Sequence, residues 1–274
     1  MSTSIHARPI GSRRRAGGAS ARRARHVKAA GLESALVNRA VDAVEHTEKP
    51  ERFLRVCAPG RRLAGWLIDL TARRPHGWVA RKTYGSGQGA PKGHEAVFDR
   101  VLDVIGPLDG ERCLEVGCGG GRLIERVLAA GARVAGVDHS PDMIDLAAKR
   151  NSGAVQTGAL ELKPAEAEQL PLPDAAFSVV LSANTFFFIE QPERALAEFF
   201  RVLSPGGRMV IATVPGPLPT PSLRNWWVYV WGSQMHVYDD EEMRSMVEHA
   251  GFSSVAITRA ADDGQPLQLV QAQR

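Results

Sequence analysis

Residues 112–128 read RCLEVGCGGGRLIERVL and change from a strand pattern to a helix pattern within a few positions. The apolar run Arg112–Val116 predicts a strand, and the pattern beginning at Arg122 predicts a helix. Residues 132–138 predict a second strand that ends in an acid, and Ser140 and Pro141 are a cap and a first-turn proline for the next helix. The stretch therefore predicts one strand–helix–strand unit of a parallel sheet.

The turn between the first strand and its helix is rich in glycine. Glycines at such a turn allow tight dihedral angles and let a ligand approach the main chain without meeting a Cβ atom. Asp138 ends the second strand, where its carboxylate could accept both hydrogen bonds of a ribose diol. The pattern predicts a nucleoside ligand, although a dinucleotide site or a purely structural turn also fits it at this point.

The rest of the chain continues the alternation of strands and helices. Strands are expected at 179–184, 208–212, 255–258 and 267–271, and helices at 94–105, 192–203 and from Asp239, where Glu242 completes a capping box. This order predicts an α/β fold with a Rossmann-like, mostly parallel sheet and helices on both faces.

Residues 94–259 resemble the class I S-adenosylmethionine-dependent methyltransferases, and within them the type 11-like group that acts on small molecules. The family motif E-x-G-x-G-x-G is met by Glu115, Gly117, Gly119 and Gly121. The second-strand acid is followed by the family's Ser-Pro-x-Met, and residues 165–178, AEAEQLPLPDAAFS, match a third family motif. The resemblance implies a seven-stranded sheet with an antiparallel last strand, and S-adenosyl-L-methionine as cofactor.

The same resemblance implies a set of cofactor-binding residues. Glu166 stands where the family usually has an aspartate that accepts from the adenine amino group, and Ala167 would offer its backbone amide to the ring. Asn184 would line the cofactor site, and Tyr84 could close over the methionine end of the cofactor. The complete expected set is Glu115, Gly117, Cys118, Gly119, Gly121, Asp138, His139, Met143, Glu166, Ala167, Asn184 and Tyr84. No metal ligand is expected.

Composition divides the chain into a tail, an extension and a catalytic domain. Residues 1–30 hold eight arginines and lysines and no acid, and their lack of large apolar side chains predicts disorder. Residues 31–93 predict a helical extension or lid, with helices at 32–46 and 62–70 and a glycine-rich end. Residues 94–274 form the expected S-adenosylmethionine-binding domain.

An insertion at 215–237 is the expected cap over the substrate. It is rich in aromatic residues, with Trp226, Trp227, Tyr229 and Trp231, which suit the wall of a pocket for an apolar or aromatic small molecule. Simple packing of these rings is the alternative interpretation. His236 is the candidate general base if the acceptor is a hydroxyl group.

Charge and cysteine content limit the partners. The formal charge is +4, so the part of the chain after the basic tail carries −4, and a nucleic-acid partner is not expected. No apolar run is long enough for a membrane span, and three cysteines without metal spacing favour a reducing cytoplasm. The oligomeric state, the acceptor and the methylated atom stay open. Two alternatives also remain: a cofactor-binding enzyme that is cyclase-like and does not methylate, and a macromolecule methyltransferase tethered by the tail.

Overall fold

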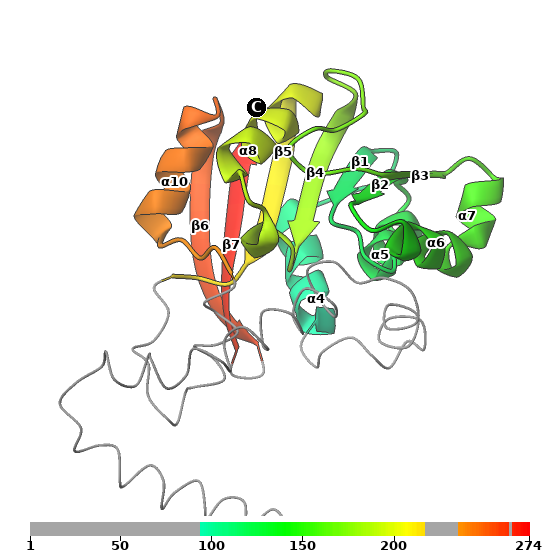
Figure 1. Cartoon of the computed structure of the whole chain (residues 1–274), viewed down its shortest axis with the longest axis horizontal. Helices are drawn as coiled ribbons and strands as arrows, with labels where there is room; N and C mark the ends of the chain where they lie inside the picture. Colours follow the sequence, from blue (N-terminus) through cyan, green and yellow to red (C-terminus); the bar gives the residue numbers. More distant parts are fainter. Residues whose placement is uncertain (1–93, 217–234, 263–264) are drawn as a thin grey trace, which may run out of the picture.

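A computed structural model describes residues 94–216, 235–262 and 265–274, which form one mixed β-sheet with helices on both faces (Figure 1). The described strands are β1 (Arg112–Val116), β2 (Arg133–Asp138), β3 (Leu160–Pro164), β4 (Phe177–Ala183), β5 (Leu203–Thr213), β6 (Ser253–Asp262) and β7 (Gln265–Gln273). Their order across the sheet is β3-β2-β1-β4-β5-β7-β6. The strands from β1 to β5 pair in parallel, whereas β7 is antiparallel to both β5 and β6. The predicted Rossmann-like sheet with an antiparallel last strand is confirmed.

Alternating side chains of the strands divide the core into two layers. The described helices are α4 (His94–Ile105), α5 (Arg122–Ala129), α6 (Pro141–Arg150), α7 (Ser152–Gln156), α8 (Pro192–Val202) and α10 (Asp240–His249), with a 3-10 turn η2 at Phe186–Phe188. Leu114, Val180 and Met209 pack with residues of α8 and α10. Cys113, Val179 and Val210 pack with residues of α4 and α5 on the opposite face. Figure 1 shows the two helix pairs on opposite sides of the sheet.

Two predicted helix starts have the expected caps. The Ser140 hydroxyl accepts a hydrogen bond from the Met143 amide, and Pro141 opens α6. At α10, the Asp239 carboxylate accepts from the Glu242 amide while the Glu242 carboxylate accepts from the Asp239 amide. Both caps satisfy amide groups that the first helical turn leaves without partners.

The largest difference between the predicted and the observed strand boundaries lies at the start of β5. β5 begins at Leu203 rather than 208, because the expected turn at 204–207 is included in the strand. Leu203 pairs with Phe177 before a shift in register, Gly206 has a positive φ of 76°, and the Gly206 amide donates to the carbonyl of Arg274. The proline and glycines therefore form an irregularity within a strand, as bulges do.

Several predictions fall on residues outside the described ranges. They are the tail 1–30, the extension 31–93 with Tyr84, and most of the insertion at 215–237. None of the helices in the described part of the chain is long and apolar enough to cross a bilayer.

Candidate functional site

The candidate site lies where the order of the strands changes direction. β1 lies between β2 and β4 in the sheet, so the chain segments that follow these three parallel strands meet at their carboxyl ends. Ligands of open α/β sheets bind in the crevice at such a switch point. The glycine turn, Asp138 and Asn184 all lie at this edge of the sheet.

Gly117 packs the turn after β1 against the turn after β4. Its amide donates to the Val137 carbonyl at 2.8 Å, and its own carbonyl accepts from the Thr185 hydroxyl at 3.1 Å. Gly117 has a φ of 76°, and a Cβ atom at this position would lie 2.2 Å from Thr185 Cγ2. Gly117 is therefore required by packing.

Gly121 has a similar packing role at the start of α5. It has a φ of 75°, and a Cβ atom there would lie 2.7 Å from Asn151 Nδ2 and 2.9 Å from Ala147 Cβ. The Asn151 side chain donates to the Gly121 carbonyl at 3.0 Å, which ties α6 to the turn. The absence of a side chain here allows α5 and α6 to pack closely.

Gly119 differs from both, because it faces open space. Apart from Gly119 itself and its two chain neighbours, no heavy atom of the described residues lies within 4 Å of a Cβ atom built at Gly119, although its φ is 49°. Its amide donates to Asp138 Oδ2 at 2.9 Å. Among the three motif glycines, Gly119 is thus the one where a ligand could approach the main chain without meeting protein atoms.

Asp138 is held in place by two main-chain amides. Besides the bond from Gly119, its Oδ1 accepts from the Ser140 amide at 2.9 Å. The residue is only 7% exposed, and burial raises the pKa of the Asp138 carboxyl, while the Ser140 amide, neighbouring His139 and the Gly119 amide oppose that shift. His139 Nδ1 lies 3.6 Å from Oδ1. Each carboxylate oxygen keeps a further lone pair for a ligand hydroxyl.

Glu115 is a buried carboxyl group one strand away from Asp138. It is 3% exposed, and burial, followed by the charge of Asp138, raises its pKa well above the ordinary value, with the Ile124 amide opposing the shift. Glu115 Oε2 is buried and has no hydrogen-bond partner among the described residues. Two buried carboxyl groups so close together favour the protonated form of Glu115.

Asn184 directly follows β4 and has an unusual backbone conformation. Its φ is 55°, a region that asparagine tolerates better than most residues, and its amide donates to the Ala212 carbonyl at 2.9 Å. Asn184 Nδ2 is buried and has no partner among the described residues. Such backbone positions are frequent at functional sites.

Glu166 and Ala167 lie in a turn beside the end of β2. The Ala165 amide donates to the Asp138 carbonyl at 3.0 Å, and the Gln169 amide donates to the Glu166 carbonyl at 3.2 Å. Glu166 is exposed. The turn expected to contact adenine is thus next to the carboxylate expected to contact ribose.

The other expected residues have different surroundings. Met143 is buried in the first turn of α6, and Cys118 is buried within the glycine turn, where burial raises the pKa of its thiol. His236 is exposed, and its amide donates to the Phe187 carbonyl at 2.8 Å, which ties it to η2 after β4. In the described ranges, no group of three or more histidine, cysteine or acidic residues is arranged to hold a metal ion.

The sequence analysis missed two residues that support the glycine turn. Arg150 Nε donates to the Gly120 carbonyl at 2.8 Å, and Asn151 holds Gly121 as described above. Both lie at the end of α6, about thirty positions after the turn they contact. A polar residue at a helix end is commonplace, so no sequence signal marks them.

Comparison with known proteins gives one consistent result. Residues 114–211 match a family model described as a methyltransferase domain. An O-methyltransferase of Penicillium expansum is 26% identical over 63% of this chain and 64% of its own length. A demethylmenaquinone methyltransferase of Clavibacter sepedonicus is 30% identical over 55% of this chain and 69% of its own length. The chain therefore spans less than two thirds of the length of the first of these relatives.

A solved structure shares the fold. The crystal structure of an S-adenosylmethionine-dependent methyltransferase from Aquifex aeolicus has a TM-score of 0.54 and 22% sequence identity with this chain. The similarity covers 71% of this chain and 97% of the Aquifex chain.

Proposed function

Since the chain belongs to the class I S-adenosylmethionine-dependent methyltransferase family, we propose that it transfers a methyl group from S-adenosylmethionine to a small-molecule acceptor. The observation that carries the proposal is the pairing of Gly119 with Asp138. An open main-chain position lies beside a carboxylate that two amides already hold in place. This arrangement suits the ribose and the adjoining part of the cofactor.

In this proposal, different residues of the site contact different parts of the cofactor. Asp138 would accept hydrogen bonds from the ribose hydroxyls, and Glu166 and Ala167 would pair with the adenine edge. Glu115 Oε2 and Asn184 Nδ2, which have no partner among the described residues, are available to polar atoms of the ligand. Cys118, His139 and Met143 would support this site from the turn, from the end of β2 and from α6.

The bound cofactor supplies an electrophilic methyl group, so the protein's own task is mainly to position the acceptor and to exclude water. Phe186 and Phe187, which follow Asn184 and Thr185, are buried and would form an apolar floor beyond the end of β4. His236 would take the proton of a hydroxyl acceptor, and its main chain is anchored to this floor through Phe187.

We propose an apolar or aromatic acceptor. The aromatic residues of the insertion at 215–237 support this choice, and the name of the Clavibacter relative specifies a quinone as its acceptor. In this proposal the insertion caps the substrate, Tyr84 and residues 31–93 act as a lid, and residues 1–30 are a tail outside the catalytic domain. The cytoplasmic location stays a prediction.

Calorimetric titration with S-adenosylmethionine and S-adenosylhomocysteine tests the cofactor site. We expect micromolar binding, about −8 kcal/mol, which D138N weakens because an amide cannot accept from two hydroxyls with both of its ends. D145N is the matched control, since Asp145 is an exposed aspartate of α6. Failure of the wild-type protein to bind either ligand would contradict the proposal. Methyl transfer itself is tested by mass spectrometry of acceptor candidates incubated with the protein and S-adenosylmethionine, which would detect the added methyl group.

A further inference from the structure

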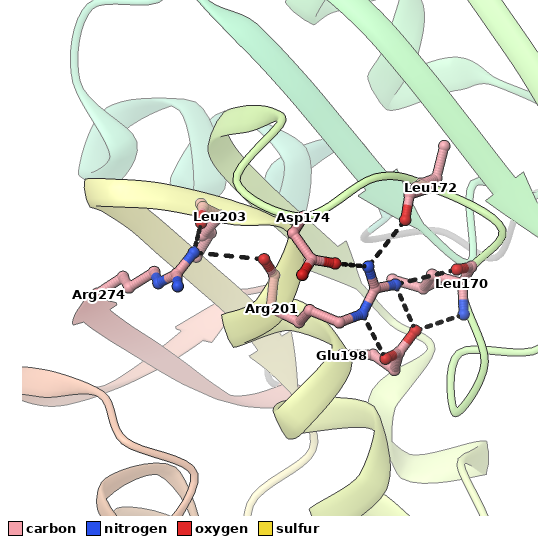
Figure 2. A network of polar contacts seen from close by, with 7 residues as sticks. All are labelled: Leu170, Leu172, Asp174, Glu198, Arg201, Leu203 and Arg274. Carbon is pink, nitrogen blue, oxygen red and sulfur yellow. Dashed lines mark hydrogen bonds and ion pairs between the residues drawn. The ribbon is translucent and has the colours of Figure 1, made fainter.

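Arg201, near the end of α8, holds a segment that comes about thirty residues earlier in the chain (Figure 2). Its Nη2 donates to the Leu170 carbonyl at 3.0 Å, and its Nη1 donates to the Leu172 carbonyl at 2.9 Å. Nη1 also pairs with the carboxylate of Asp174 at 2.5 Å. One side chain thus contacts three residues of the segment between β3 and β4.

Glu198, one turn earlier on α8, completes this arrangement. Its carboxylate accepts from Arg201 Nε at 2.7 Å and from Nη2 at 2.8 Å, which is a bidentate ion pair. Glu198 Oε2 also accepts from the Leu170 amide at 2.7 Å. The pairing with Arg201 lowers the pKa of Glu198. The amide and the carbonyl of Leu170 are therefore both bound by side chains of the same helix (Figure 2).

The end of α8 is itself fixed. The Arg201 carbonyl accepts from the Ala175 amide at 2.9 Å and from Arg274 Nη1 at 3.3 Å. The Arg274 guanidinium lies 4.8 Å from the centre of the Phe200 ring and also donates to the Leu203 carbonyl. Arg201 thus attaches the segment to a helix end that several contacts keep in place.

The attached segment carries the turn expected to contact adenine. The Ala165 amide is bound to the Asp138 carbonyl, and the Leu170 amide is bound to Glu198. Only residues 166–169 lie between these two anchors, and the Gln191 amide adds a third tie to Glu168 at 3.2 Å. A turn of four residues fixed at both ends has little freedom to move.

We propose that Arg201 is a positioning residue for the nucleobase, and that its contacts give the site its preference for adenine over hypoxanthine. The inference rests on the proposed function. Adenine presents a donor amino group and an acceptor ring nitrogen, and hypoxanthine presents the reverse pattern at the same positions. Glu166 and the Ala167 amide match adenine only while their turn is held rigidly, since hydrogen bonds weaken steeply with small changes in geometry.

Calorimetric titration with S-adenosylhomocysteine and S-inosylhomocysteine tests the inference on the full chain. The variants are R201M and R201K. The matched control is R194M, because Arg194 is an exposed arginine of the same helix whose Nη1 donates to the side chain of Gln191, the residue before the helix. We expect the wild-type ratio of the two dissociation constants to fall about tenfold in R201M, equivalent to about 1.4 kcal/mol. The ratio should fall less in R201K, because lysine keeps the positive charge but lacks the planar, forked guanidinium donors, and it should not change in R194M.

Each outcome has a distinct meaning. A wild-type protein that binds neither ligand overturns the proposed function, whereas one that binds both equally overturns the adenine contacts and the inference with them. A preference retained in R201M and R201K overturns the inference alone, even if circular dichroism shows a lower melting temperature. If R201M does not fold, the ratio in R201K decides. The double variant R201M/E166A should lose no more of the preference for adenine than E166A alone does. Additive losses in the double variant would count against a role of Arg201 through Glu166.

Discussion

Replacing Gly119 by alanine should separate cofactor binding from folding. A Cβ atom at this position meets no heavy atom of the described residues within 4 Å, so the packing of the protein itself is undisturbed. The remaining penalty is the positive φ of 49°, which costs an alanine roughly 1–2 kcal/mol. For a domain of this size the melting temperature should fall by about 2–8 °C.

The substitution should also weaken binding, independently of this small loss of stability. If the cofactor passes over Gly119, the new methyl group occupies space that the ligand needs, and overpacking of this kind costs about 1–3 kcal/mol. The dissociation constant for S-adenosylhomocysteine should therefore rise between about 5-fold and about 150-fold.

G158A is the control for the backbone penalty. Gly158 also has a positive φ, 74°, and open space around its Cβ position, but it lies after α7, away from the glycine turn. Differential scanning calorimetry should give similar melting temperatures for G119A and G158A, and isothermal titration should show weakened binding in G119A only. Wild-type affinity in a folded G119A protein would refute the placement of the cofactor over this turn.

Three further predictions follow from the packing and the buried acids. G117A should lower the free energy of unfolding by about 2–5 kcal/mol in urea titrations, because its Cβ would lie 2.2 Å from Thr185 Cγ2 in a residue with positive φ. E115Q should gain stability over the wild type as the pH rises above 4.5, the ordinary pKa of glutamate. The reason is that the raised pKa of Glu115 makes the folded state hold this proton more tightly than the unfolded state does. Unfolding titrations at several pH values would show no such trend if Glu115 were ionised in the folded protein. In a C57S background, native protein at pH 8 should resist Ellman's reagent until it unfolds. The two described cysteines, Cys113 and Cys118, are buried, and burial raises the pKa of Cys113 to about 12. Rapid labelling of the native protein would contradict this burial.

The sequence predicted the strands and the glycine turn at which the candidate site lies, but not how the three glycines of that turn differ. Spacing identified Gly117, Gly119 and Gly121 as one motif, yet two of them serve packing and one faces open space. That difference depends on Thr185 and on Ala147, which come from other elements of the fold. A pattern of residues along one strand and turn cannot show which neighbours the fold will bring to it.

Arg201 shows the same limit more strongly. Two of its acceptors are main-chain carbonyls, at positions 29 and 31 residues earlier, and any residue type could supply them. Likewise, the Ser204–Gly207 stretch has the composition of a turn, but the pairing of Leu203 with Phe177 and of Gly206 with Arg274 keeps it within β5. Contacts made by the main chain over long sequence separations leave little trace in residue identity.

The interior place of β1 in the sheet would link the lifetime of the protein to its ligand. β1 pairs with β2 on one side and with β4 on the other, so the glycine turn takes its shape only when the middle of the sheet has formed. A ligand that binds this turn binds the folded chain and not the unfolded one, and at a concentration of 100 times its dissociation constant it would add about 2.7 kcal/mol to the free energy of unfolding. Proteolysis that depends on global opening would slow by about a hundredfold under those conditions, so the supply of cofactor would set how long each molecule survives.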